Sequence, residues 1–141
     1  MQTAGNRVGV SICYEMIFPD LIRQAVKNGA NFLVNITNDA WFGKSAASYQ
    51  HRSMGALRAV ENRISIVRVA NTGVSGTIEA TGNLRDETKL FTEEFRVTQI
   101  TPATGGKTFY SLNGDVFSWI CLLLTGLIAI AARRGNTKNE L

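Results

Sequence analysis

The first hundred residues alternate short apolar runs with segments whose apolar positions recur every three to four residues. Short apolar runs bounded by turn residues predict buried strands, and the three- to four-residue spacing predicts amphipathic helices. Strands are expected at Val8–Cys13, Phe32–Thr37, Ser65–Ala70, Val74–Ala80 and Phe95–Ile100, and helices at Pro19–Asn28 and Ala46–Asn62. The order β-α-β-α-β-β-β indicates a layered α/β or α+β domain.

Particular residues predict where these elements end and which side of them is buried. Pro19 suits the first turn of the first helix, and Gly29 suits the cap after its last residue. Thr81–Asn83 has the composition of a tight turn between the last two strands. The second helix is expected to bury one stripe, made of Met54, Leu57, Val60 and Ile64.

A long run without charges lies near the C-terminus. Val116–Ala132 is apolar on every side of a helix, includes Trp119 near one end and stops at Arg133. A buried core helix is the alternative, but a run of this length that ends at two arginines favours a membrane span. More Lys and Arg follow the run than precede it, which predicts a cytoplasmic C-terminus and a domain outside the cytoplasm.

Composition narrows the possible functions. Of the 141 residues, 45% are hydrophobic and 18% charged, which excludes an intrinsically disordered chain. Two cysteines and one histidine argue against a disulfide framework or a metal site, and no cofactor is expected. Half of the net charge of +4 lies in residues 133–141, which leaves a nearly neutral main body, so nucleic-acid binding is not expected. The expected organisation is a domain over 1–107, a linker over 108–115, a membrane helix over 116–132 and a basic tail over 133–141.

The candidate catalytic residues lie where the first predicted strand ends. Cys13 lies between a strand and a helix, where a sharp turn can present a nucleophile beside backbone N–H groups that hold an oxyanion. Glu15 follows closely and could orient a base or a substrate amine. The alternative is that Cys13 is a small buried hydrophobe. His51 could pair with Cys13, although its place one turn into a helix is more typical of a surface or packing residue.

Several motifs resemble known families. Cys13-Tyr14-Glu15 with Phe18-Pro19-Asp20, and Arg58-Ala59-Val60-Glu61-Asn62-Arg63, are similar to motifs of the nitrilase, or carbon–nitrogen hydrolase, superfamily. The more specific segments resemble the bacterial apolipoprotein N-acyltransferases: Asn38-Asp39-Ala40-Trp41-Phe42-Gly43, Gln50-His51, Asn71-Thr72-Gly73-Val74-Ser75, and Gly114-Asp115 before a terminal membrane helix. The membrane helix favours this branch, because soluble nitrilases lack one.

This resemblance implies part of a nitrilase-like αββα sandwich, followed by a transmembrane helix in the bacterial inner membrane with the domain on the periplasmic side. Cys13 would take an acyl chain from a phospholipid and pass it to the N-terminal diacylglyceryl-cysteine of an apolipoprotein. The Tyr14 N–H would hold the oxyanion, and Glu15 matches a glutamate near the nucleophile. The substrate site would include Asn38, Trp41 and Phe42, although the two aromatic residues could instead cap a core. Asp39 could be a helix or turn cap.

The chain departs from the family in one respect. The family's triad also contains a Glu and a Lys upstream of the Cys, and Met1–Ile12 contains neither. The chain is therefore expected to correspond to the C-terminal quarter of the enzyme and to be inactive alone, with the apolar faces of Val8–Cys13 and Phe32–Thr37 exposed. The alternatives are a nitrilase-type amidohydrolase and a non-catalytic, membrane-anchored fragment.

Overall fold

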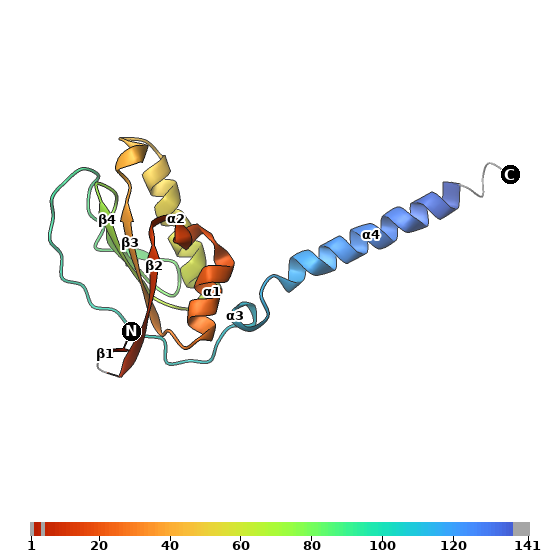
Figure 1. Ribbon diagram of the computed structural model, residues 1–141, viewed down its shortest axis with the longest axis horizontal. Helices are drawn as coiled ribbons and strands as arrows, with labels where there is room; N and C mark the ends of the chain where they lie inside the picture. The colour runs from red at the N-terminus through yellow and green to blue at the C-terminus, as the bar shows by residue number, and fades with distance from the viewer. Residues whose placement is uncertain (1, 4, 137–141) are drawn as a thin grey trace.

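The computed structural model describes residues 2–3 and 5–136 and contains one mixed six-stranded sheet (Figure 1). The strands lie side by side in chain order: β1 Gln2–Thr3, β2 Asn6–Ile12, β3 Phe32–Asn38, β4 Ile66–Asn71, β5 Gly76–Ile78 and β6 Leu84–Arg85. β2, β3 and β4 are parallel, and the other pairings are antiparallel. The sheet confirms the expected mixture of layered α/β elements.

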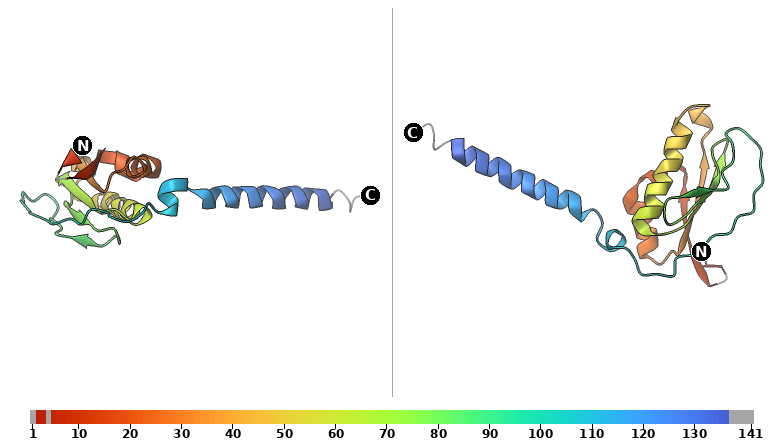
Figure 2. Two further views of the ribbon diagram at one scale, coloured as in Figure 1. Left: turned by 90° about the horizontal axis from the view of Figure 1, so that it is seen from below. Right: turned by 180° about the vertical axis from the view of Figure 1, so that it is seen from behind.

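Two helices connect the parallel strands and cover one face of the sheet (Figures 1 and 2). α1 spans Pro19–Lys27 and α2 spans Ala47–Asn62, close to the predicted bounds. The core lies between these helices and the sheet and contains Met16, Ile22, Val26, Leu33, Ala59, Ile64, Ile66 and Ile78. Two crossovers of the same hand place both helices on the same side.

The opposite face of the sheet is apolar and open. Its side chains form two rows across the parallel strands, Val10, Val34 and Val67 in one and Ile12, Ile36 and Val69 in the other. Four of the six are about half exposed, which confirms the expected exposure of the first two strands. Parallel sheets are normally covered on both faces. The described residues thus form one helix layer and one sheet, half of the four layers of an αββα sandwich.

The buried side of α2 differs from the prediction. Met54, Leu57 and Val60 are 40%, 53% and 50% exposed, whereas Gly55 faces the core. A Cβ at Gly55 would lie 2.7 Å from Cδ1 of Ile78, so a larger residue would force the end of the Ile78 side chain to move. The buried face of α2 is composed of small and polar residues, and the apolar stripe lies on its outer side. Of the four predicted positions, only Ile64, just beyond the helix, is buried.

The predicted strand at Phe95–Ile100 is also wrong. The turn at Thr81–Asn83 is confirmed, since the Glu79 N–H donates to the Asn83 carbonyl at 2.8 Å. The chain then forms β6 directly after this turn, and β6 pairs with β5. β4 and β6 occupy both edges of β5, so the later segment does not pair with β5. Residues 86–107 form an irregular connection instead.

A short helix joins the domain to the last helix. The predicted linker contains α3, Phe109–Asn113, which is docked on α2. The Thr108 hydroxyl donates to the Glu61 carbonyl at 2.6 Å, and the fully buried Ser111 hydroxyl donates to Asn62 at 2.9 Å. These contacts fix the segment from which the last helix starts.

α4 spans Val116–Asn136 and projects away from the domain (Figures 1 and 2). Its segment Val116–Arg133 has a mean hydropathy of 2.0 and none of it is buried, so it is long and apolar enough to cross a membrane. The helix extends past the predicted end at residue 132. The last five residues of the predicted basic tail, 137–141, lie outside the described residues.

Candidate active site

Cys13 occupies a strained turn at the carboxyl end of β2. It begins a short 3-10 helix, Cys13–Ile17, and has a φ of 52°, in the left-handed region. That conformation costs a non-glycine residue about 1–2 kcal/mol, and such strain persists at functional sites where surrounding contacts hold it. The predicted turn at this residue is therefore present, and Cys13 is partly exposed rather than a buried hydrophobe.

Two hydrogen bonds hold this turn from either side. A Glu15 carboxylate oxygen accepts the Ile12 N–H at 2.7 Å. The Asn35 side-chain amide donates to the Cys13 carbonyl at 3.3 Å. The Glu15 side chain is exposed. Its contact in this structure is with the backbone N–H next to Cys13 and not with a base.

The predicted substrate residues lie at the same edge of the sheet. Asn38 ends β3, and its side-chain oxygen accepts the Ala40 N–H at 3.1 Å and the Asn71 amide at 3.2 Å. Trp41 donates its indole N–H to the Asn38 carbonyl at 2.8 Å and is 81% exposed. The carboxyl ends of parallel strands are where α/β sheets place ligands. Trp41 therefore does not cap a core and is available for contacts outside the domain.

Tyr14 and Phe42 meet around His51. The Tyr14 and His51 ring centroids are 5.4 Å apart, and the Phe42 ring contacts His51 edge-on at 6.0 Å. His51 is buried and is thus a packing residue rather than a surface one. Its Nε2 has no hydrogen-bond partner among the described residues, the Cys13 thiol included. The structure consequently forms no Cys–His pair.

A buried network behind the turn was not anticipated. Arg68 on β4 donates to Asp39 at 2.8 Å, and both side chains are almost completely buried. Asp39 also lies 3.1 Å from Nδ1 of His51. It stands before the short 3-10 helix Ala40–Phe42 but its side chain makes no cap bond, so the alternative of a side-chain cap is not observed. A proton on Nδ1 would donate to this carboxylate. Burial lowers the pKa of Arg68, and the charges of Asp39 and Cys13 oppose that shift.

One signal in the sequence could have revealed Arg68. Ile66 and Arg68 are two residues apart in β4, and side chains at this spacing point to the same face of a sheet. Ile66 is in the core, so the same alternation that buries it also buries a guanidinium, which needs an anionic partner.

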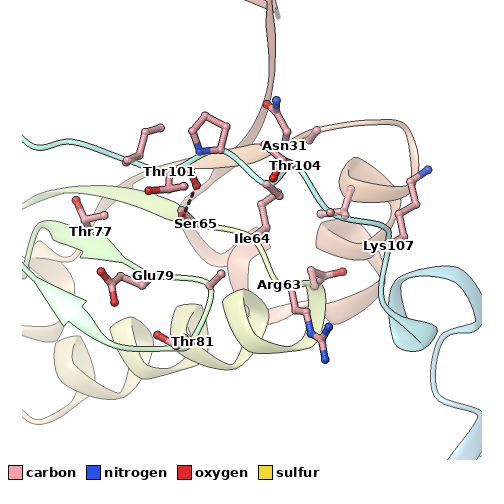
Figure 3. Close-up of a pocket in the computed structure, with 18 of the residues that line it drawn as sticks. Asn31, Arg63, Ile64, Ser65, Thr77, Glu79, Thr81, Thr101, Thr104 and Lys107 are labelled. Atoms are coloured by element: carbon pink, nitrogen blue, oxygen red, sulfur yellow. Dashed lines mark hydrogen bonds between the residues drawn. The ribbon is translucent and has the colours of Figure 1, made fainter.

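A separate cavity lies away from Cys13. It has a volume of about 610 Å³ and is bounded by the connection through Thr101 and Lys107, the end of α2 at Arg63 and the start of β4 (Figure 3). These elements surround the amino ends of the parallel strands, opposite Cys13. Neither Cys13 nor His51 is among the described residues that line it. Within residues 2–3 and 5–136, no three His, Cys, Asp or Glu side chains gather as metal ligands.

Comparisons with known proteins identify the family of this chain. The carbon–nitrogen hydrolase family matches residues 1–110. The chain belongs to the carbon–nitrogen hydrolase family. Its fold is similar to a carbon–nitrogen hydrolase from Helicobacter pylori, with a TM-score of 0.56 and 14% identity over 63% of this chain and 38% of that one. An amidase from Nesterenkonia gives a TM-score of 0.55 at 21% identity, over 64% of this chain and 37% of the other.

Among curated members of the family, the similar proteins are apolipoprotein N-acyltransferases. The protein of that name from Geobacter metallireducens is 46% identical over 134 residues, which cover 95% of this chain and 26% of the relative. Apolipoprotein N-acyltransferase 1 of Treponema denticola is 37% identical, over 84% of this chain and 22% of the relative. The chain therefore spans about a quarter of the length of these relatives.

Proposed function

We propose that this chain is the C-terminal, nucleophile-bearing part of an apolipoprotein N-acyltransferase. The observation that carries the proposal is the left-handed turn at Cys13, which places a partly exposed thiol at the carboxyl edge of the parallel sheet. The names of the relatives support acyl transfer as the reaction. The aromatic residues at the same edge of the sheet support it as well.

The proposed reaction has two steps with a covalent intermediate. In the first, the Cys13 thiolate attacks an ester carbonyl of a phospholipid. A carbon–sulfur bond forms, the ester carbon–oxygen bond breaks, and the lysophospholipid oxygen takes the proton removed from the thiol. In the second, the α-amine of a diacylglyceryl-cysteine attacks the thioester. An amide forms, the thiolate leaves, and the proton lost by the amine returns to the base. The Tyr14 N–H would stabilise both oxyanions.

In this proposal α4 gives the domain access to lipid substrates. A helix of this length and hydropathy crosses a bilayer in the proposal, with Trp119 at one interface and Arg133 at the cytoplasmic one. The docked α3 then holds the domain close to the membrane surface. Phospholipid and apolipoprotein are both membrane-anchored, so the domain would meet them in two dimensions on the periplasmic side.

The proposal assigns the catalytic base to sequence outside this chain. A free thiol titrates near pH ~8.5, so Cys13 needs a base at neutral pH. His51, the internal candidate, does not reach the thiol. The open apolar sheet face supports the same conclusion, because a second layer would cover it and could carry the Glu and Lys of the family. We therefore expect the isolated chain to be inactive and to self-associate.

The test compares this chain alone with a fusion in which it replaces the matching C-terminal segment of the Geobacter metallireducens relative. Each protein is purified in detergent and given phosphatidylethanolamine and a diacylglyceryl peptide. The fusion should transfer acyl chains, whereas its Cys13→Ala variant and the isolated chain should not. A Cys121→Ser fusion is the matched control and should remain active.

Three results would contradict the proposal or part of it. A folded, membrane-inserted fusion without transfer contradicts the activity. Cleavage of a soluble amide without lipid or acceptor would support an amidohydrolase instead. Turnover by the isolated chain well above its Cys13→Ala variant would contradict the external base, and His51→Ala would then identify an internal one.

A further inference from the structure

Arg68 is held rigidly behind the Cys13 turn. Its guanidinium donates from Nη1 to the Asn35 side-chain oxygen at 2.7 Å and from Nη2 to Asp39 at 2.8 Å. Nε donates to the Val74 carbonyl at 3.2 Å. Arg68 is 2% exposed, so water does not compete for these donors. A planar group bonded on three sides has one allowed orientation.

Asn35 connects Arg68 to Cys13, the nucleophile candidate, through hydrogen bonds. Its side-chain amide lies fully buried on β3 and donates to the Cys13 carbonyl at 3.3 Å and to the Ser11 hydroxyl at 3.1 Å. Because its oxygen accepts from Arg68, the amide cannot flip without losing a charge-assisted bond. A continuous series of hydrogen bonds thus connects the buried Arg68 guanidinium to the Cys13 backbone.

We propose that Arg68 and Asn35 are positioning residues that hold Cys13 in its left-handed conformation and so aim its thiol and the following N–H groups. Asp39 keeps Arg68 in place, and Thr37 and His51 in turn contact Asp39 at 3.2 and 3.1 Å. The consequence for turnover rests on the proposed acyl transfer, whereas the effect on the Cys13 backbone does not.

A purely structural role explains these contacts less well. Well-packed hydrophobic residues often stabilise a fold as much as a buried ion pair does. The sheet would accept such residues at positions 35 and 68, since Leu33 and Ile66 already occupy the same face of the same strands. The feature that hydrophobic residues could not supply is a donor to the Cys13 carbonyl.

Two variants interrupt this series of hydrogen bonds at different points. Asn35→Asp keeps an acceptor for Arg68 but removes the donor to Cys13. Arg68→Lys keeps the charge but loses the planar fork that orients Asn35. Ile64→Val is the control, because it trims a fully buried core residue outside the network. If Asn35→Asp does not fold, Arg68→Lys still tests the proposal, and thermal melting reports the stability of all three.

The first measurement is solid-state NMR of the chain in lipid with ¹³C-labelled cysteine. Only Cys13 and Cys121 are labelled, and Cys121 in α4 is an internal helical reference. Self-association does not prevent this measurement. In both network variants the Cys13 Cα and Cβ signals should shift from left-handed towards extended values, while the Cys121 signals stay constant. Unchanged Cys13 signals in both variants would overturn the proposal.

The second measurement uses the active fusion. Misplacement of a catalytic group by about 1 Å costs roughly 100-fold in rate. Each network variant should therefore lower kcat by about 100-fold with an unchanged KM for phospholipid, and Ile64→Val should change neither. A rise in KM at constant kcat would contradict positioning. An unmodified fusion without turnover would contradict the proposed function, and the NMR result would still decide the role of Asn35 and Arg68.

Discussion

Replacing Asp39 by alanine tests whether the buried network behind Cys13 is needed for folding. The Asp39 carboxylate is 1% exposed and accepts hydrogen bonds from Arg68 at 2.8 Å and Thr37 at 3.2 Å, with His51 3.1 Å away. Asp39→Ala leaves the Arg68 guanidinium buried without its counter-charge. Removing one partner of a buried pair costs about 3–5 kcal/mol of unfolding free energy. That is a large share of the roughly 5–15 kcal/mol that stabilises a typical domain.

The chain offers a matched control for this substitution. Asp20 also pairs with an arginine, Arg23, at 3.0 Å, but its side chain is 74% exposed. Asp20→Ala should therefore cost about 0–1 kcal/mol. Both variants would be unfolded in urea and assayed by pulse proteolysis in mild detergent. With an m value of about 1–3 kcal/mol/M, Asp39→Ala should lower the midpoint by about 1 M or more.

A midpoint for Asp39→Ala close to that of Asp20→Ala would contradict a role of the Asp39 carboxylate in folding. It would mean that Arg68 finds water or another partner when the carboxylate is removed. The double variant Asp39→Ala with Arg68→Met provides an independent check. It should recover part of the lost stability, because it no longer contains an unpaired buried charge.

Three further predictions concern other parts of the chain. Gly55→Leu should destabilise the domain by about 1–3 kcal/mol in urea unfolding, because its Cβ alone would lie 2.7 Å from Cδ1 of the buried Ile78 and the rest of its side chain would overpack the core; an unchanged midpoint would contradict the close approach of α2. Burial raises the pKa of Glu61 against the opposing charge of Arg58, so the protonated form favours folding and that contribution is lost as pH rises from about 4.5. The stability of Glu61→Gln relative to the native chain should therefore increase from pH 4 to 7, and a constant difference would contradict this sign. In the fusion, a single cysteine at position 138 should be labelled by an impermeant thiol reagent only after cells are opened, and labelling of intact cells would reverse the proposed orientation.

The parts of the fold set by local pattern could be predicted from the sequence. The three parallel strands are rich in apolar residues, although Asn35 and Arg68 interrupt two of them, because both faces of such strands are normally buried. Pro19 and Gly29 delimit α1 as expected, since α1 ends at Lys27 and Gly29 has a φ of 101°. The position of Cys13 between strand and helix was sufficient to predict a turn that presents its thiol.

Features that depend on distant partners could not be predicted in this way. The spacing of Met54, Leu57 and Val60 shows that one side of α2 is apolar, but periodicity does not say what covers that side. Arg68 and Asp39 are brought together only because β3 and β4 pair in one register. Likewise, the alternation at Phe95–Ile100 suited a strand, and only the pairing of β6 with β5 shows that the free edge of β5 is taken by another segment.

The most direct test of the account is the identity of the cysteine that carries the acyl chain. The fusion would be incubated with phosphatidylethanolamine without acceptor, quenched in acid and digested for mass spectrometry. We predict a thioester on the peptide that contains Cys13, lost in Cys13→Ser and discharged when the diacylglyceryl peptide is added. Acylation confined to Cys121, or a thioester that persists unchanged in Cys13→Ser, would contradict it.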